Sequence, residues 1–488
     1  MASMAQGARR PTFDGYFRFA ENGTTFWRDT LAGATTFIVM SYIIFLNPAI
    51  LSFAGVPGLE EQGLPFNGVL ASTCLVAGVM TIIMGLVTNR AFAIAPGLGL
   101  NAVVAFTLVA TEGLGFPEAM GIVVMEGALV TLLVILGMRE KVMRAIPLEL
   151  KKAIAIGIGL FIAFIGLDNA GLIVSQEGSP PVALADLTTW PSLVAIFGLV
   201  LAIVLRAIRF RGDLLVAIVA TTIFATIVNK ATDYAAYPDS SFARWPSDIA
   251  ESPNFSLVGE FSFDSFASVG IVTTLAFVFA LFLADFFDTM GTIVGVGKQA
   301  GYLDKNGELP EIRKPLLVDS VAAMAGGAAS ASSATTYIES GAGVGVGGRT
   351  GWVSVVTGLL FFPFMFFAPL IGMVPPQATG VILVIVGWLM ATALVDVETE
   401  AEPGGPERRT PGIDFHNFAL GFSALLAIII MPFTFSITNG IGFGFISYVV
   451  IRVAQGDARK VHPLMYAAAG AFTLYFLIPL LHDNLSWI

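Results

Sequence analysis

The chain has 488 residues, of which 56% are hydrophobic and only 12% are charged, and its formal net charge is −10 at pH 7. Soluble proteins carry about a quarter charged residues, so this chain lacks the polar surface of a water-soluble protein. The acidic balance excludes a nucleic-acid binder, which needs a basic face, and the single cysteine, Cys74, excludes an internal disulfide and a cysteine-based metal cluster.

What remains is an all-α polytopic membrane protein, because apolar stretches of about 20 residues, the length a helix needs to cross the hydrocarbon core, recur along the chain. Residues 1–28 lack an apolar core, so they are predicted to be a cytoplasmic segment and not a cleavable signal peptide. In the first half, spans are predicted at Leu31–Phe53, Phe66–Val87, Ala91–Ala110, Pro117–Gly137, Pro147–Leu167, Pro191–Ile208 and Asp213–Val228. After a polar extracellular loop, residues 230–265, spans are predicted at Phe266–Gly297, Pro315–Ala329, Thr336–Val346, Thr350–Leu370, Pro376–Leu394, Phe415–Met431, Thr438–Val453 and Pro463–Leu481.

The basic residues test this threading. If the N-terminus is cytoplasmic and every stretch crosses, only Lys230 and Arg244 of the 25 Lys and Arg residues lie outside. Cytoplasmic loops of membrane proteins carry such an excess of positive charge. The sequence therefore predicts a multi-pass protein of the cell membrane with a cytoplasmic N-terminus.

Two of the stretches are broken by proline and glycine. Ala91–Ala110 contains Ala95-Pro-Gly-Leu-Gly-Leu-Asn101, in which Pro96 suits the first turn of a half-helix, and Thr336–Val346 is short and rich in glycine. Non-helical backbone at membrane depth is tolerated only inside protein or beside a cavity. Such segments at corresponding places in two halves point to a transporter's binding site, and these are spans 3 and 10.

The two halves also echo each other. Pro147 and Gly159 recur 228 residues later as Pro375 and Gly387. Seven spans per half is an odd number, so the second copy would be inserted upside down. We therefore expect fourteen transmembrane helices as two inverted repeats of seven, with short strands in spans 3 and 10.

Ionisable side chains inside spans are costly and mark function by default. Asp285, Asp288 and Thr292 are spaced by three and four residues, which puts them on one helical face. Two carboxylates this close in a low dielectric resist ionising together, so one is expected to hold or release a proton. A purely structural role for one of them, as a cap or a local pair, stays open, above all for Asp285.

The second broken segment carries another acid. Thr335 to Tyr337 favours extended backbone and glycines follow, which predicts a short strand leading into a half-helix. Thr336-x-x-Glu339 also fits a capping box, in which the glutamate bonds the start of its own helix. At membrane depth a ligand-facing Glu339 is favoured, and the two roles can coexist.

Other features narrow the function. For Glu126, Asp168 and Asp319, which lie near span ends or interfaces, a structural role is favoured. The sequence offers no nucleophile–base arrangement, metal cluster, dinucleotide fingerprint or phosphate loop. We therefore expect no enzyme activity, cofactor or metal, and transport driven by an ion gradient or by the substrate alone.

Several motifs occur together: Phe19-Ala-Glu-Asn-Gly-Thr-Thr25, Met40-Ser-Tyr-Ile-Ile-Phe-Leu-Asn-Pro48, Ala95-Pro-Gly-Leu-Gly-Leu-Asn-Ala102, Asp285-Phe-Phe-Asp-Thr-Met-Gly-Thr292, Thr335-Thr-Tyr-Ile-Glu-Ser340 and Gly347-Gly-Arg-Thr-Gly351. Over about residues 17–462 the chain resembles the AzgA-like branch of the nucleobase transporters, the hypoxanthine/guanine/adenine permeases. The resemblance implies an elevator-like motion of a core domain against a gate domain. The core would comprise 29–138 and 266–371 and the gate 139–229 and 372–454, with 455–488 as an additional C-terminal helix.

The resemblance also implies the site. The family's substrate positions fall on Asn101, Asp288 and Glu339. In the related uracil transporters the eighth-span pair is a glutamate and a histidine, which correspond here to Asp288 and Thr292. Without that histidine, Asp288 and Glu339 are the candidate proton carriers, together with Asp285. The residues expected to bind substrate are Asn101, Asp288, Glu339, Thr292, Thr336, Tyr337 and Phe287, the aromatic ones as stacking faces for a flat base.

The sequence thus predicts an importer of purine nucleobases (adenine, guanine, hypoxanthine) that works by cation symport, with H⁺ as the expected ion. The alternatives are an anion transporter of the same architecture, as for sulfate or bicarbonate, and a passive nucleobase channel. An anion site needs a cation or unopposed helix N-termini, whereas the predicted pocket is acidic. The partners are the purine and the lipid bilayer, with no nucleic acid. The preferred purine, H⁺ against Na⁺ coupling and a homodimer are left open.

Overall fold

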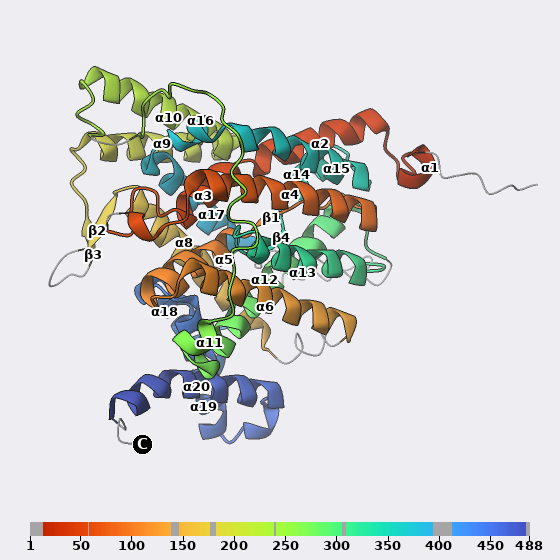
Figure 1. Ribbon diagram of the computed structural model, residues 1–488. Coiled ribbons are helices and arrows are strands. Elements are labelled where there is room, and N and C mark those ends of the chain that lie inside the picture. The colour runs from red at the N-terminus through yellow and green to blue at the C-terminus, as the bar shows by residue number, and fades with distance from the viewer. Residues whose placement is uncertain are drawn as a thin grey trace, which may run out of the picture.

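A computed structural model describes residues 13–56, 58–137, 146–175, 182–238, 241–304, 309–393 and 412–484. Two short strands, β1 (Ile94–Pro96) and β4 (Ala334–Thr336), lie near the middle of a stack of helices (Figure 1). Helices α9 and α10 form one edge of the stack, and α19 and α20 form the opposite edge. Within the described residues, eight helical segments are long and apolar enough to cross a membrane, and five shorter apolar helices accompany them.

The element bounds follow the predicted stretches closely. In the first half the helices are α1 (Phe13–Phe17), α2 (Phe26–Met40), α3 (Ile43–Leu51), η1 (Glu60–Gln62), α4 (Phe66–Thr88), α5 (Leu98–Ala102), the π-helical η2 (Val103–Thr111), α6 (Phe116–Ile135), α8 (Leu148–Asn169), α9 (Trp190–Ala207) and α10 (Asp213–Ala231). Strands β2 (Ile173–Ser175) and β3 (Val182–Leu184) form a small hairpin between α8 and α9. In the second half they are α11 (Ser265–Ser268), α12 (Ile271–Ala300), α13 (Arg313–Ala328), α14 (Ser340–Gly345), α15 (Gly351–Phe361), η3 (Phe362–Phe366), α16 (Ala368–Gly372), α17 (Pro376–Ala393), α18 (Phe418–Phe433), α19 (Ile437–Ala454), η4 (Ala458–Lys460) and α20 (Pro463–Asn484).

The first predicted span corresponds to one candidate membrane span, Phe26–Leu51. Within it the chain turns at Ser41 and Tyr42 between α2 and α3, where the Ser41 hydroxyl donates to the Ile38 carbonyl oxygen at 3.0 Å. One local expectation was wrong, because Pro96 does not begin a half-helix. It ends β1, opposite Ala334, where a residue without an N–H costs little, and α5 starts only after it.

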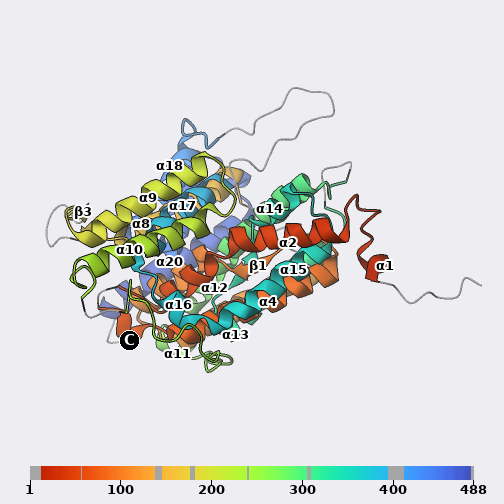
Figure 2. The same cartoon turned by 90° about the horizontal axis from the view of Figure 1, so that it is seen from above.

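Glycines let pairs of helices touch through their backbones. Where α8 crosses α17, a Cβ atom on Gly159 would lie 2.4 Å from the Gly387 carbonyl oxygen, and one on Gly387 would lie 2.3 Å from that of Gly159. Helices α4 and α15 run side by side in Figure 2 and meet in the same way at Gly85 and Gly351. Small residues permit this close approach in membrane proteins, where van der Waals contact replaces the hydrophobic effect. These interfaces therefore have no room for a larger side chain.

The predicted loop between the halves runs over one face of the helix stack from α10 to α11 (Figure 1). Its backbone N–H groups donate to carbonyl oxygens along the way, Ala243 to Met373 and Gly259 to Ala328. Ser262 donates to Pro117. The loop is therefore bonded to helix ends that belong to both halves of the sequence.

A buried carboxylate, Asp29 in the first turn of α2, joins two of the sequence motifs. Asp29 is not exposed, and its carboxylate accepts hydrogen bonds from the Thr24 hydroxyl, the Arg349 N–H, and both the N–H and hydroxyl of Thr350, at 2.5 to 3.1 Å. The Arg349 guanidinium in turn donates to the Val344 carbonyl oxygen at 2.7 Å, at the end of α14. Asp29 therefore fixes the short helix α14 against α2.

Asp29→Ala is expected to lower the free energy of unfolding by about 3 kcal/mol or more, because four donors lose their acceptor in a buried place. Thermal unfolding of the purified protein in detergent measures the loss. Glu21→Ala is the matched control, because that carboxylate pairs with Arg18 on the exposed surface. Equal melting temperatures for Asp29→Ala and the control would contradict the assignment.

Candidate functional site

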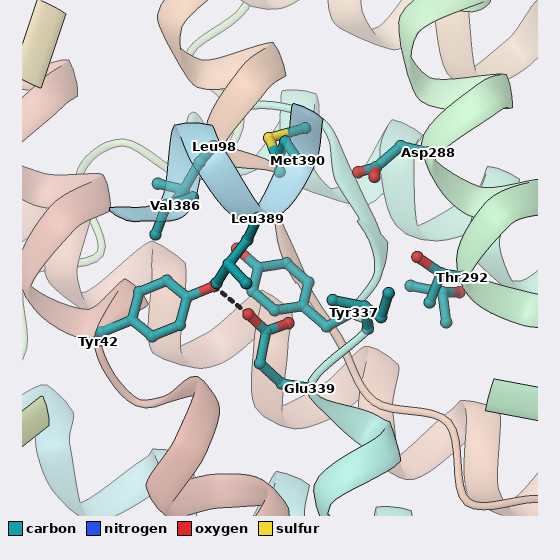
Figure 3. Close-up of a pocket in the computed structure, with 12 residues that line it drawn as sticks. Tyr42, Leu98, Asp288, Thr292, Tyr337, Glu339, Val386, Leu389 and Met390 are labelled. Atoms are coloured by element: carbon teal, nitrogen blue, oxygen red, sulfur yellow. Dashed lines mark hydrogen bonds between the residues drawn. The ribbon is translucent and has the colours of Figure 1, made fainter. Parts of the chain in front are cut away.

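A cavity lies where the two broken segments meet α12 and α17 (Figure 3). Its polar lining residues are Tyr42, Asp288, Thr292, Thr336, Tyr337 and Glu339. Its other lining residues are Gly97, Leu98, Ile338, Val386, Leu389 and Met390. The cavity therefore has a polar wall, built mainly from α12 and the β4–α14 segment, and an apolar wall from α17.

The backbone of the site is held by pairing between the two broken segments. Strands β1 and β4 are antiparallel, with Ala95 opposite Thr335. The ladder is extended at both ends, because the Gly97 N–H donates to the Ser333 carbonyl oxygen at 2.8 Å and the Tyr337 N–H donates to that of Ala93 at 2.9 Å. This pairing satisfies backbone groups that hydrocarbon could not, so irregular chain can persist at this depth.

Glu339 lies directly before α14 and is half-buried. Its Oε1 accepts a hydrogen bond from the Tyr42 hydroxyl at 2.6 Å, so the carboxylate is held at the edge of the cavity (Figure 3). The Thr336 side chain does not cap α14 and instead donates to Asp319 at 2.7 Å, so the capping box is not formed. Sequence reasoning missed Tyr42, although it is a polar residue within an apolar span and within one of the motifs.

Asp288 and Thr292 lie one turn apart on α12, across the cavity from Tyr42 in Figure 3. Asp288 is half-buried and Thr292 is buried. Asp285, one turn before Asp288, has no exposed surface and does not contribute to the cavity lining. Phe287 lies on the same helix, but its side chain is outside the described part of the structure. Asp288 and Thr292 therefore line the cavity, whereas Asp285, which was predicted to share their helical face, is buried behind it.

Another carboxylate, the fully buried Asp319, supports the site from behind. The Asp319 side chain on α13 accepts hydrogen bonds from the Thr336 N–H at 2.8 Å and from the Thr289 hydroxyl at 2.7 Å. The Thr289 hydroxyl also lies 2.7 Å from that of Thr335. Since Thr289 follows Asp288, Asp319 connects α12 to β4 at the level of the cavity. The sequence favoured a structural role for Asp319, and its place beside the site was not predicted.

Asn101 lies on α5 and is fully buried, outside the residues that line the cavity. Its amide donates to the Asn47 Oδ1 at 2.5 Å, and the Asn47 amide donates to the Thr73 hydroxyl and the Ala331 carbonyl oxygen. Asn101 Oδ1 has no hydrogen-bond partner among the described residues. The pair therefore links α3, α4, α5 and the segment before β4.

A model of the Permease family, Xan_ur_permease, matches residues 28–401. The chain belongs to the nucleobase/ascorbate transporter family. This permease is 35% identical over 470 residues to the adenine permease AdeQ of Escherichia coli K12, covering 96% of each chain. It is 34% identical over 463 residues to the guanine/hypoxanthine permease PbuG of Bacillus subtilis 168, covering 95% of this chain and 99% of that one. The family membership expected from the motifs is confirmed.

The fold of the permease also has a counterpart among solved structures. The transmembrane domain of the cyanobacterial bicarbonate transporter BicA aligns with a TM-score of 0.58 at 16% identity, covering 84% of this chain and 96% of that one. Together with the apolar helices, this likeness shows a helical polytopic membrane transporter fold.

The chemistry of the permease's cavity follows from its residues. The two carboxylates can accept hydrogen bonds, the tyrosine and threonine hydroxyls can donate or accept, and the tyrosine rings offer flat apolar faces. The described lining residues include no Lys or Arg. No group of three or more His, Cys, Asp or Glu that could hold a metal occurs in the part of the chain that the structure describes. The cavity suits a small ligand that carries N–H donors and no negative charge.

Proposed function

We propose that this permease is a secondary transporter that imports purine nucleobases, with the cavity between α12 and the β4–α14 segment as its substrate site. The observation that carries the proposal is that two carboxylates, Asp288 of α12 and Glu339 directly before α14, line one cavity without a cation among its described residues. Relatives that cover nearly the whole chain are named as permeases of adenine and of guanine/hypoxanthine. The purine identity therefore rests on the cavity's chemistry and on these relatives together.

Purine bases match this lining. They are flat, uncharged near neutral pH and rich in N–H donors, which carboxylates accept well. Glu339 and Asp288 would take the base's N–H groups, and Thr292 and Thr336 would bond ring nitrogens or a carbonyl oxygen. Tyr337 would provide a stacking face, and α17 would cover the apolar edge. Asn101 would act through Asn47 and the backbone around β4, a role at one remove from the substrate.

We propose fourteen spans in two inverted sets of seven, followed by α20. Two pairs of elements that this symmetry would exchange contact each other, β1 with β4 and α8 with α17. The symmetry would also turn the contact between α4 and α15 into that between α13 and α6, and both contacts are present. The glycines predicted to be equivalent, Gly159 and Gly387, face each other across the α8–α17 contact. The distribution of Lys and Arg supports a cytoplasmic N-terminus in the cell membrane.

An elevator motion and proton symport complete the proposal. The cavity lies between the proposed core, which supplies Tyr42, Leu98, Asp288 and Glu339, and the proposed gate helix α17. Movement of the core along α17 would carry the substrate with it. A carboxyl beside the substrate, Asp288 or Glu339, would take up a proton on one side and release it on the other, and Asp285 stays a candidate for this relay.

Uptake in proteoliposomes tests the proposal. Radiolabelled adenine, guanine and hypoxanthine are offered with inward pH and sodium gradients imposed separately. We expect saturable uptake that unlabelled purine inhibits and that the pH gradient accelerates. Uptake that does not saturate would indicate a channel, and acceleration by sodium alone would contradict proton coupling.

An anion transporter is the second candidate, because the BicA transmembrane domain shares the fold. The acidic lining argues against it, since an anion beside two carboxylates meets like charge. Sulfate and bicarbonate are therefore expected to leave purine uptake unchanged. Transport of either anion at a rate comparable to adenine would reverse this assignment.

A further inference from the structure

An apolar groove lies away from the substrate site, between α10 and the η3–α16 segment. Its empty volume is about 1360 Å³. One wall is the stripe of α10 from Leu215 to Ile227, and the other is formed by Phe45 of α3 with side chains of η3 and α16. We call it the seam groove. Ile223 and Ile227 on its rim are 56% and 60% exposed, so the groove opens outward from the helix stack.

The seam groove has little to offer a polar occupant. Its two threonines donate within their own helix, Thr222 to the Ile218 carbonyl oxygen and Thr226 to that of Thr222, each at 2.8 Å. The remaining wall is aliphatic and aromatic. An occupant gains free energy here by burying hydrocarbon or by dispersion contact.

One end of the groove has the opposite character. A neighbouring cavity, with an empty volume of about 1190 Å³, shares Trp245 and Met373 with the groove and is also lined by Arg244 and Ser52. Arg244 Nε and Ser52 Oγ are buried and have no hydrogen-bond partner among the described residues. Both can donate, and one belongs to a cation, so this end suits an anion with several acceptor oxygens.

The groove is long enough for one acyl chain, and one of its ends lies near an exposed tryptophan. Trp245 is 69% exposed, as is usual for tryptophan at the membrane–water interface. From Leu215 to Ile227 the helix rises about 18 Å, which is most of α10, and an acyl chain fills half of the hydrocarbon core, about 15 Å. The groove is therefore long enough to hold a whole acyl chain whose headgroup lies at the interfacial, cationic end.

We propose that an anionic phospholipid binds here, with one acyl chain in the seam groove and its phosphate at Arg244 and Ser52. Hydrocarbon length, an apolar wall and unused donors at one end are the complement of that molecule. A soluble ligand would match only the polar end, and a neutral lipid would leave the guanidinium without an anion.

The site also connects parts that are expected to move, and this step rests on the proposed function. α10 belongs to the proposed gate, and Phe45 and η3 to the proposed core. The loop already bridges them, because the Asn229 amide donates to the Ala243 carbonyl oxygen at 3.2 Å and the Glu251 N–H donates to that of Phe366, in η3, at 2.8 Å. A lipid chain between the same elements would be reshaped in each transport cycle, so uptake would depend on the lipid bound.

Native mass spectrometry of the full-length protein tests the site. Delipidated protein is titrated with phosphatidylglycerol or phosphatidylcholine, and the fraction carrying a lipid gives each affinity. We expect wild type to prefer phosphatidylglycerol, and Arg244→Ala to lose that preference by about five- to tenfold, the effect of one cation near an anionic headgroup. Lys230→Ala, which removes an exposed cation from the same end of α10, is the control and is expected to keep the preference.

Filling the groove gives an independent test. Ile223→Trp is expected to weaken the binding of both lipids, because the larger ring occupies the position of the acyl chain. Ile203→Trp, on the exposed face of α9, is expected to leave the binding of both lipids unchanged. Unchanged lipid preference in Arg244→Ala, or equal lipid binding by the two tryptophan variants, would overturn the site. Lipid binding is measured without transport, so lipid-bound protein that fails to take up purine in any liposome would refute the proposed function and leave the site standing.

Discussion

Glu339→Gln is expected to abolish saturable purine uptake while the protein still folds and reaches the membrane. The amide removes the charge that accepts the base's N–H groups, and hydrogen bonds to a charged group contribute about 1.5–3 kcal/mol, or roughly 10- to 100-fold in affinity. It also removes a carboxyl that could carry a proton. The fold should be retained, because the glutamine carbonyl oxygen can still accept from the Tyr42 hydroxyl.

Uptake of radiolabelled adenine in proteoliposomes, together with thermal unfolding in detergent, measures both parts of this expectation. Tyr42→Phe is the matched comparison, because it keeps the carboxylate and removes only the hydroxyl that orients it at 2.6 Å. We expect that variant to keep transport with an affinity several-fold weaker. If Glu339→Gln transported adenine with wild-type affinity and rate, Glu339 would not be a substrate ligand.

Asp288→Asn is expected to reduce uptake as severely. Asp288 lines the cavity next to Thr292, on the wall supplied by α12, so its carboxylate can reach the substrate from the side away from Tyr42. Asparagine has nearly the same shape as aspartate, and its amide cannot take up a proton at the pH values at which uptake is measured. Loss of acceleration by a pH gradient, with binding partly retained, would mark Asp288 as the proton carrier.

Asp285→Asn is the control for this prediction, because Asp285 is one turn away, fully buried and outside the cavity lining. We expect it to affect stability more than the response to a pH gradient. Normal proton-driven uptake by Asp288→Asn would exclude Asp288 from coupling. Loss of the response to a pH gradient in Asp285→Asn alone, with a normal melting temperature, would assign proton coupling to Asp285 in place of Asp288.

The fold was largely predictable because hydrocarbon imposes a simple rule on sequence. Apolar length located the helices, and proline and glycine located both breaks at β1 and β4. The turn at Ser41 and Tyr42 was not predictable, because the apolar pattern continues through it. The pairing of β1 with β4 depends on contacts between segments that are far apart in the sequence, which no local pattern encodes.

The candidate site was predictable only in part. Asp288, Thr292, Thr336, Tyr337 and Glu339 lie together at one cavity, as acids and polar groups at membrane depth suggest. The network around Asp319 was not predictable from the sequence, because its position beside α12 and β4 is set by the packing of α13. Burial likewise separates Asp285 from Asp288, although their spacing on the helix puts them on the same side.

The β1–β4 ladder has a consequence for how the protein is made. Ile94 pairs with Thr336, a residue synthesised 242 positions later. At about 5–20 residues per second, the first strand leaves the ribosome roughly 10 to 50 s before its partner exists. Until then its backbone groups must be sheltered by water, by the translocation machinery or by temporary contacts. Assembly of the centre is thus a late event in biogenesis, and a ribosome-bound chain that ends before β4 should be far more vulnerable to proteases than one that ends after it.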